Sequence, residues 1–171
     1  MPTTLPNETT LTGERAELAQ TLAQHRGFLR YTVRDLTDEQ ATRRTTASEL
    51  TLAGLIKHVT YVERRWQRFA VDGAPAMADT SGWADAFRLL PGETLAGLLD
   101  EYALVASRTA ELIATLPDLD RAHALPEAPW FEPGATWSVR RVLLHVLAET
   151  AQHAGHADII REALDGQKTM G

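Results

Sequence analysis

One stretch decides the fold and the chemistry of this chain: Leu144-His145-Val146-Leu147-Ala148-Glu149-Thr150-Ala151-Gln152-His153-Ala154-Gly155-His156. At roughly 100° per residue, an α-helix places all three histidines of this stretch within about 40° of Glu149. Val142 and Ile160 fall on or beside the same face, which is the face that an amphipathic helix turns toward a core. A carboxylate and imidazoles are costly to bury unless they are paired or bind a metal. The stretch therefore predicts a core-facing helix that carries a polar site.

Three further segments have apolar residues at the three- and four-residue spacing of a helix. Together with the stretch above, they predict long helices over about residues 13–35, 51–70, 93–116 and 137–165. No segment has a convincing strand pattern. Four long helices without a sheet favour a four-helix bundle, so the expected fold class is all-α.

Two long connections separate the last three helices, over about residues 72–92 and 118–135. Connections of this length are uncommon inside a compact domain unless they cross the fold or cover a site. One of them is therefore expected to join parallel helices, which gives the bundle an up-down-down-up topology. A short helix is expected near residues 83–89, inside the first connection.

The length of 171 residues is sufficient for one domain with a sizeable core. We expect a flexible lead-in over residues 1–11, the bundle over residues 12–166 and a tail over residues 167–171. The start of the sequence has no basic region followed by an apolar run, so no signal peptide is predicted. No apolar run approaches the length of a membrane span.

The net charge and the absence of cysteine exclude several kinds of partner and of functional site. A net charge of −6 and a pI near 5.5 argue against nucleic acid or an anionic membrane as the main partner. The absence of cysteine removes disulfides, cysteine nucleophiles and thiolate-rich zinc sites together. The absence of cysteine suits a cytoplasmic protein.

Three side chains are candidates to hold a divalent metal. Glu149 and His153 are one helical turn apart on the same face, so both can reach a single ion. His58 is the only histidine in the second predicted helix and falls on its apolar stripe. Two ligands from one helix and one from another leave coordination positions open to water or substrate, as in catalytic zinc sites. Zinc is the expected metal, and nickel, iron and manganese accept the same donors.

Other assignments stay open at this point. His156 lies one turn beyond His153, so a triad of Glu149, His153 and His156 from one helix is the main rival. His145 and His156 are too far apart along the helix to serve one ion together, so at least one of them has another role. Each histidine, taken alone, also fits an ordinary core residue bonded to a carbonyl group.

Four residues are candidates for a catalytic or cavity-lining role, namely His145, His156, Tyr61 and Arg65. Tyr61 and Arg65 follow His58 by about one and two turns and can line the same cavity, but plain packing and a solvated charge are the simpler interpretation. Three aromatic residues can roof a pocket or staple the last helix: Trp130, Phe131 and Trp137.

At these residues the chain resembles the DinB/YfiT-like superfamily of metal-binding four-helix bundles. The last helix of that superfamily reads E-x-x-x-H or H-x-x-x-H followed by x-G, which Glu149-Thr-Ala-Gln-His153-Ala-Gly155 fits. The third ligand of the superfamily matches His58 in Leu55-Ile-Lys-His58-Val. The combination of His, Glu and His is similar to mycothiol-dependent maleylpyruvate isomerase, and the whole pattern over residues 12–166 is similar to a mini-circle-protein-like branch.

The resemblance implies a metal-dependent thiol transferase or isomerase that uses a low-molecular-weight thiol, such as mycothiol, bacillithiol or glutathione, and that is often a homodimer. In this interpretation the metal activates the thiol for attack on an electrophilic small molecule. Two alternatives are kept: a bundle that binds metal for stability or for interaction without catalysis, and a hydrolase that uses metal-bound hydroxide. Fold-level likeness does not decide among them.

Overall fold

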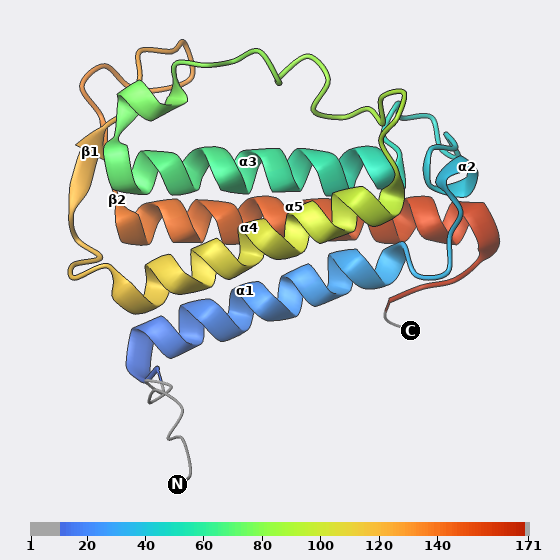
Figure 1. Cartoon of the computed structure of the whole chain (residues 1–171), viewed down its shortest axis with the longest axis horizontal. Helices are drawn as coiled ribbons and strands as arrows, with labels where there is room; N and C mark the ends of the chain where they lie inside the picture. Colours follow the sequence, from blue (N-terminus) through green and yellow to red (C-terminus); the bar gives the residue numbers. More distant parts are fainter. Residues whose placement is uncertain (1–10, 170–171) are drawn as a thin grey trace, which may run out of the picture.

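Residues 11–169, which the computed structural model describes, form a bundle of four long helices (Figure 1). The helices are α1 (Gly13–Thr32), α3 (Leu52–Asp72), α4 (Leu95–Thr115) and α5 (Val139–Asp165). The predicted all-α bundle is therefore confirmed. The predicted lead-in, apart from Leu11, and residues 170–171 of the predicted tail lie outside the described residues.

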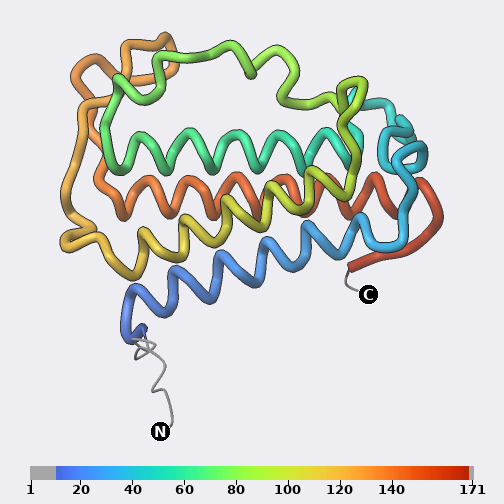
Figure 2. The backbone as a smooth tube through the Cα atoms, viewed as in Figure 1, coloured from blue at the N-terminus to red at the C-terminus, as the bar shows by residue number. Residues whose placement is uncertain are grey.

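The helices run up-down-down-up, as predicted. In Figure 1, α1 and α5 point one way, and α3 and α4 point the other way. The first long connection, residues 73–94, has to return along the whole bundle to join the parallel helices α3 and α4, and Figure 2 shows it running beside α3. The second, residues 116–138, stays at one end and joins antiparallel helices.

Two expectations about these connections are wrong. The second connection contains a small antiparallel pair, β1 (Ala122–Ala124) with β2 (Thr136–Ser138), although no strand was expected. Three residues per strand are too few for an alternating pattern to stand out in the sequence. Residues 83–89 form turns, not a helix, and a 3-10 helix, η1 (Ala74–Met77), lies earlier in the first connection. Contacts with α3 position this segment: Phe87 stacks on His58, Trp83 packs edge-on against Tyr61, and the carbonyl oxygen of Arg88 accepts a hydrogen bond from Lys57.

Three helices begin with the same capping device. The hydroxyl of Thr51 accepts a hydrogen bond from the backbone N–H of Gly54 at the start of α3, and Thr94 accepts one from Gly97 at the start of α4. Ser138 does the same for α5. Such caps satisfy backbone donors that the first helical turn leaves free. The short helix α2 (Asp38–Ala41) begins with a capping box of Thr37 and Gln40.

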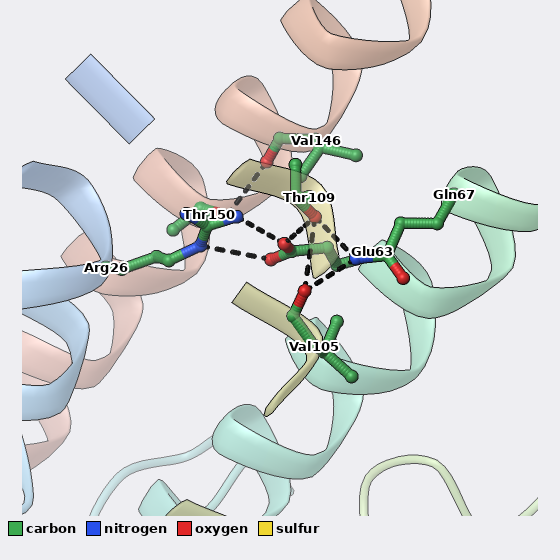
Figure 3. Close-up of polar contacts among 7 residues, drawn as sticks. All are labelled: Arg26, Glu63, Gln67, Val105, Thr109, Val146 and Thr150. Atoms are coloured by element: carbon green, nitrogen blue, oxygen red, sulfur yellow. Dashed lines mark hydrogen bonds and ion pairs between the residues drawn. The ribbon is translucent and has the colours of Figure 1, made fainter. Parts of the chain in front are cut away.

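The core consists of two apolar clusters, one toward each end of the bundle, with a polar layer between them. In that layer the buried carboxylate of Glu63 on α3 pairs with Arg26 from α1 and accepts a hydrogen bond from Thr109 of α4. Gln67 joins the layer by donating to the carbonyl oxygen of Val105 at 2.7 Å. Figure 3 shows these side chains reaching toward one another from different helices.

Among residues 11–169, no helix combines the length and the apolar character needed to cross a membrane.

Candidate metal centre

Side chains from two helices meet between α3 and α5. His58 comes from α3, and Glu149 and His153 come from α5. The Oε2 atom of Glu149 lies 3.7 Å from Nε2 of His58 and 3.4 Å from Nε2 of His153. One donor atom of each residue lies within 4.8 Å of the other two. The fold thus brings together the three residues that the sequence predicts as ligands.

The spacing of these donors fits a divalent cation. Atoms bonded to a tetrahedral zinc ion at about 2.0–2.1 Å are about 3.3–3.4 Å apart. The two separations from Glu149, 3.4 and 3.7 Å, are close to that value. Two imidazole nitrogens and one carboxylate oxygen also match a catalytic zinc site with three protein ligands. The residues present are therefore suited to hold one ion.

Helix geometry and packing explain the orientation of His58. The residue is only 4% exposed, because it lies on the face of α3 that packs against α5. The ring of Phe87, from the first connection, stacks on the imidazole with ring centroids 3.8 Å apart and planes 14° apart. The Nδ1 atom of His58 has no hydrogen-bond partner among the described residues. Nε2 is therefore the nitrogen that faces a polar group, the carboxylate of Glu149.

Glu149 is kept in its ionised form by its neighbours. Contact with His153, and then with His58, lowers the pKa of the Glu149 carboxyl below its ordinary value of 4.5. Burial acts in the opposite direction but is outweighed, and His145 adds to the lowering. Since a carboxylate must be deprotonated to bind a metal, this environment prepares Glu149 as a ligand.

His145 lies on the other side of the same carboxylate. Its Nε2 atom is 3.8 Å from Oε1 of Glu149, and its ring meets Trp66 and Trp137 edge-on, with centroids 4.8 and 5.0 Å away. Burial lowers the pKa of His145, Glu149 opposes that shift, and the charge of Arg141 reinforces it. Burial therefore favours the neutral form of the His145 imidazole beside the carboxylate.

His156 does not lie where a metal-binding triad of Glu149, His153 and His156 requires it. Its Nδ1 atom lies 3.3 Å from Nδ1 of His153, whereas Nε2 of His153 is the atom that faces Glu149. His156 therefore contacts the nitrogen of His153 that points away from Glu149, and it is not one of the converging donors. Its position suits the control of the orientation and tautomer of His153.

Arg65 and Tyr61 are engaged with the first connection. The guanidinium of Arg65 donates to the carbonyl oxygens of Met77 at 2.9 Å and Asp79 at 2.6 Å, and the residue lines a cavity beside the candidate metal centre. Tyr61 packs edge-on against Trp83, with centroids 6.1 Å apart. Its hydroxyl has no hydrogen-bond partner among residues 11–169. The two hydrogen bonds of Arg65 tie the first connection to α3 beside the site.

A cavity of about 410 Å³ opens beside the candidate metal centre. His58, Glu149 and His145 form its polar end. The two long connections and α3 supply its aromatic walls, which consist of Trp66, Trp83, Trp130 and Phe131. A second cavity of about 550 Å³ adjoins it and shares Pro126, Ala128 and Phe131 as walls.

The sequence indicates some of the aromatic residues around the cavity but not all of them. Trp130 and Phe131 were candidates to roof a pocket, and both line the cavity. Trp137 instead stacks behind it on Trp66, with centroids 4.7 Å apart. Phe87 was not singled out, although it covers His58. Its only signal is an aromatic residue inside a long connection, which does not indicate what the ring will touch.

Three comparisons with known proteins bear on the family and the fold. A family model described as mycothiol-S-transferase matches residues 17–166. Among solved structures, the chain is similar to a conserved protein from Enterococcus faecalis, with a TM-score of 0.64 and 16% identity over 92% of this chain and 100% of that one. At this identity the likeness shows the fold alone. No curated protein matches the chain significantly.

Proposed function

The chain belongs to the mycothiol-S-transferase family, and we propose that it is a divalent-metal-dependent enzyme that transfers a low-molecular-weight thiol, such as mycothiol, to an electrophilic small molecule. One observation carries the proposal: His58, Glu149 and His153 converge, and two of them, His58 and Glu149, line a cavity. A closed structural site uses four protein ligands, whereas three ligands beside a cavity leave room for a substrate atom.

The three ligands give the site its chemistry. His58, Glu149 and His153 would hold a divalent cation, and such a cation would favour the deprotonated form of a coordinating thiol. The chain has no cysteine, so the sulfur nucleophile has to come from a substrate. Zinc is the proposed metal, because two nitrogen donors and one oxygen donor suit it, and nickel, iron and manganese are the other candidates.

His145 has the position and protonation state of a proton acceptor. It lines the cavity on the far side of Glu149, and burial lowers its pKa. A neutral imidazole at the cavity wall can accept the proton that a thiol releases. Glu149 in turn can stabilise the imidazolium that forms, because its Oε1 atom lies 3.8 Å from Nε2 of His145.

The two adjoining cavities suit a reaction with two substrates. The cavity of about 410 Å³ reaches the metal centre, and the neighbouring cavity of about 550 Å³ has a more polar wall that includes Glu127 and Glu132. Carboxylates accept hydrogen bonds from hydroxyl groups. We propose that the cavity of about 550 Å³ binds the polar part of the thiol substrate, and that the reaction takes place in the aromatic cavity of about 410 Å³. A homodimer and a cytoplasmic location stay predictions.

Metal analysis and a thiol-depletion assay test the proposal together. Purified protein is expected to bind one divalent metal per chain and to consume mycothiol in the presence of an alkylating electrophile, with bacillithiol and glutathione assayed in parallel. His153→Ala should lose both properties, because it removes a ligand. His25→Ala, which removes a histidine packed on Phe28 of α1, should keep both.

Other outcomes would contradict the proposal. Equal stoichiometric metal in the wild type and in His153→Ala would refute the ligand assignment. Metal removal that unfolds the protein, with no thiol consumed beforehand, would indicate a structural site. Metal-dependent hydrolysis of an ester without any thiol would indicate the hydroxide mechanism.

A further inference from the structure

The cavity beside the metal centre is aromatic on several sides. Trp66 comes from α3, Trp83 comes from the first connection, and Trp130 and Phe131 come from the second. Segments far apart in the sequence thus contribute large flat rings to one concave surface. Ligand pockets are typically lined by apolar and aromatic side chains with a few polar groups that set the orientation.

Two of these rings are far more exposed than their size favours. Trp83 is 56% exposed and Trp130 is 77% exposed, although both line the cavity. Trp66, at 7%, is buried and is backed by Trp137. Leaving an indole in water forgoes the free energy of burying it, about 25 cal/mol per Å² of apolar surface. Exposed apolar surface on a concave site is a mark of ligand binding.

The charged side chains around this cavity restrict which ligands can bind between its aromatic walls. Arg65 is the only lysine or arginine among the described residues that line this cavity, and its guanidinium already donates to the carbonyl oxygens of Met77 and Asp79. An acidic ligand would therefore find no free cationic side chain on these walls.

We propose that the acceptor of the thiol is an uncharged aromatic electrophile, whose ring packs against Trp83, Trp130 and Phe131. This inference rests on the proposed transferase function and names its acceptor. For an arylmethyl halide, a bond forms between the thiol sulfur and the methylene carbon as the carbon–halogen bond breaks. The halide leaves with the bonding electron pair, and the proton of the thiol passes to the imidazole of His145 or directly to water.

Calorimetric titration of the metal-loaded full chain tests binding without any reaction. The probe is 1-naphthylmethanol, which has the ring but no leaving group. Trp83→Ala and Trp130→Ala are each expected to weaken its Kd roughly 3- to 10-fold, the range of one aromatic contact. Leu104→Ala is the matched control, because it truncates a large apolar side chain that is 53% exposed on α4, and it should leave Kd unchanged. Failure of the probe to bind would overturn the inference.

A kinetic comparison separates this inference from the function on which it rests. The kcat/KM for 1-(chloromethyl)naphthalene should exceed that for chloroacetamide, each relative to its uncatalysed reaction with the thiol, and Trp130→Ala should reduce the first more than the second. Turnover without such a preference would refute the aromatic acceptor and leave the transferase intact. Binding of naphthylmethanol that depends on the tryptophans, without turnover of any electrophile, would support the aromatic site and refute the transferase.

Discussion

The imidazole of His153 makes a polar contact through each of its two nitrogens. Nε2 lies 3.4 Å from Glu149, and Nδ1 lies 3.3 Å from Nδ1 of His156. A histidine that binds a metal through one nitrogen carries its proton on the other, and the acceptor of that proton fixes the tautomer and the ring orientation. We infer that His156 accepts this hydrogen bond from His153.

At the residue scale we therefore predict that His156→Ala weakens metal binding about 10–100-fold, the usual effect of losing such a partner. His156→Asn should restore part of the affinity, because its side-chain oxygen can accept the same hydrogen bond. Competition titration against a chromophoric chelator measures the metal Kd, with His25→Ala as the control. An unchanged Kd in His156→Ala would contradict the role.

At the scale of elements, the first connection and α3 form one unit around His58. Lys57 donates to the carbonyl oxygen of Arg88 at 2.9 Å and to Glu93 at 2.7 Å, which ties the end of the connection to the helix. Gly54 lets the two backbones approach, since a Cβ atom there would lie 2.2 Å from the carbonyl oxygen of Phe87. Glycine at this position therefore allows Phe87 to stack on His58.

Gly54→Ala should destabilise the protein by about 1–3 kcal/mol, as overpacking does, and weaken metal binding because Phe87 must move. Gly97→Ala is a matched control, because Gly97 occupies the same helical position after a capping threonine in α4. Its Cβ would meet only the Thr94 hydroxyl, at 3.2 Å, so stability should change by less than about 1 kcal/mol. Urea unfolding and chelator titration measure both quantities. Equal effects of the two substitutions would contradict the close-approach argument.

At the scale of the whole molecule, the polar layer in Figure 3 links the helices across the centre of the bundle. The side chain of Glu63 is fully buried and that of Arg26 is 10% exposed, so this ion pair has lost nearly all of its hydration. Hydrogen bonds from Thr109 and Arg26 to the Glu63 carboxylate replace those that water would make. A pair of this kind adds little net stability, but its removal from one side leaves a buried charge without a partner.

We predict that Glu63→Leu lowers the free energy of unfolding by about 3–5 kcal/mol, because Arg26 stays charged in the core. The double variant Arg26→Met with Glu63→Leu should recover most of that loss, since no unpaired charge remains. Glu101→Ala breaks a neighbouring pair with Arg64 that is partly exposed, and should cost less than about 1 kcal/mol. Urea titration of the variants provides the comparison. A double variant no more stable than Glu63→Leu alone would contradict this account.

The sequence by itself was sufficient for the bundle and the candidate ligands, which depend on local periodicity, and for the direction pattern, which depends on the length of a connection. Apolar spacing of three and four residues marks a helix wherever it occurs, and the length of residues 73–94 implies a return along the fold. Glu149 and His153 share a helix face for the same reason. His58 could be added because it is a histidine on a buried stripe of another helix.

Only the tertiary structure decided which polar groups meet and what surrounds them. The stretch that carries Glu149 left the roles of His145 and His156 open, and packing placed His145 at the cavity and His156 behind His153. Contacts such as Phe87 on His58 join segments whose separation in the chain leaves no local pattern. Such contacts depend on how closely two backbones approach and on which side chains fill the space between them. Periodicity along one segment contains no information about the other.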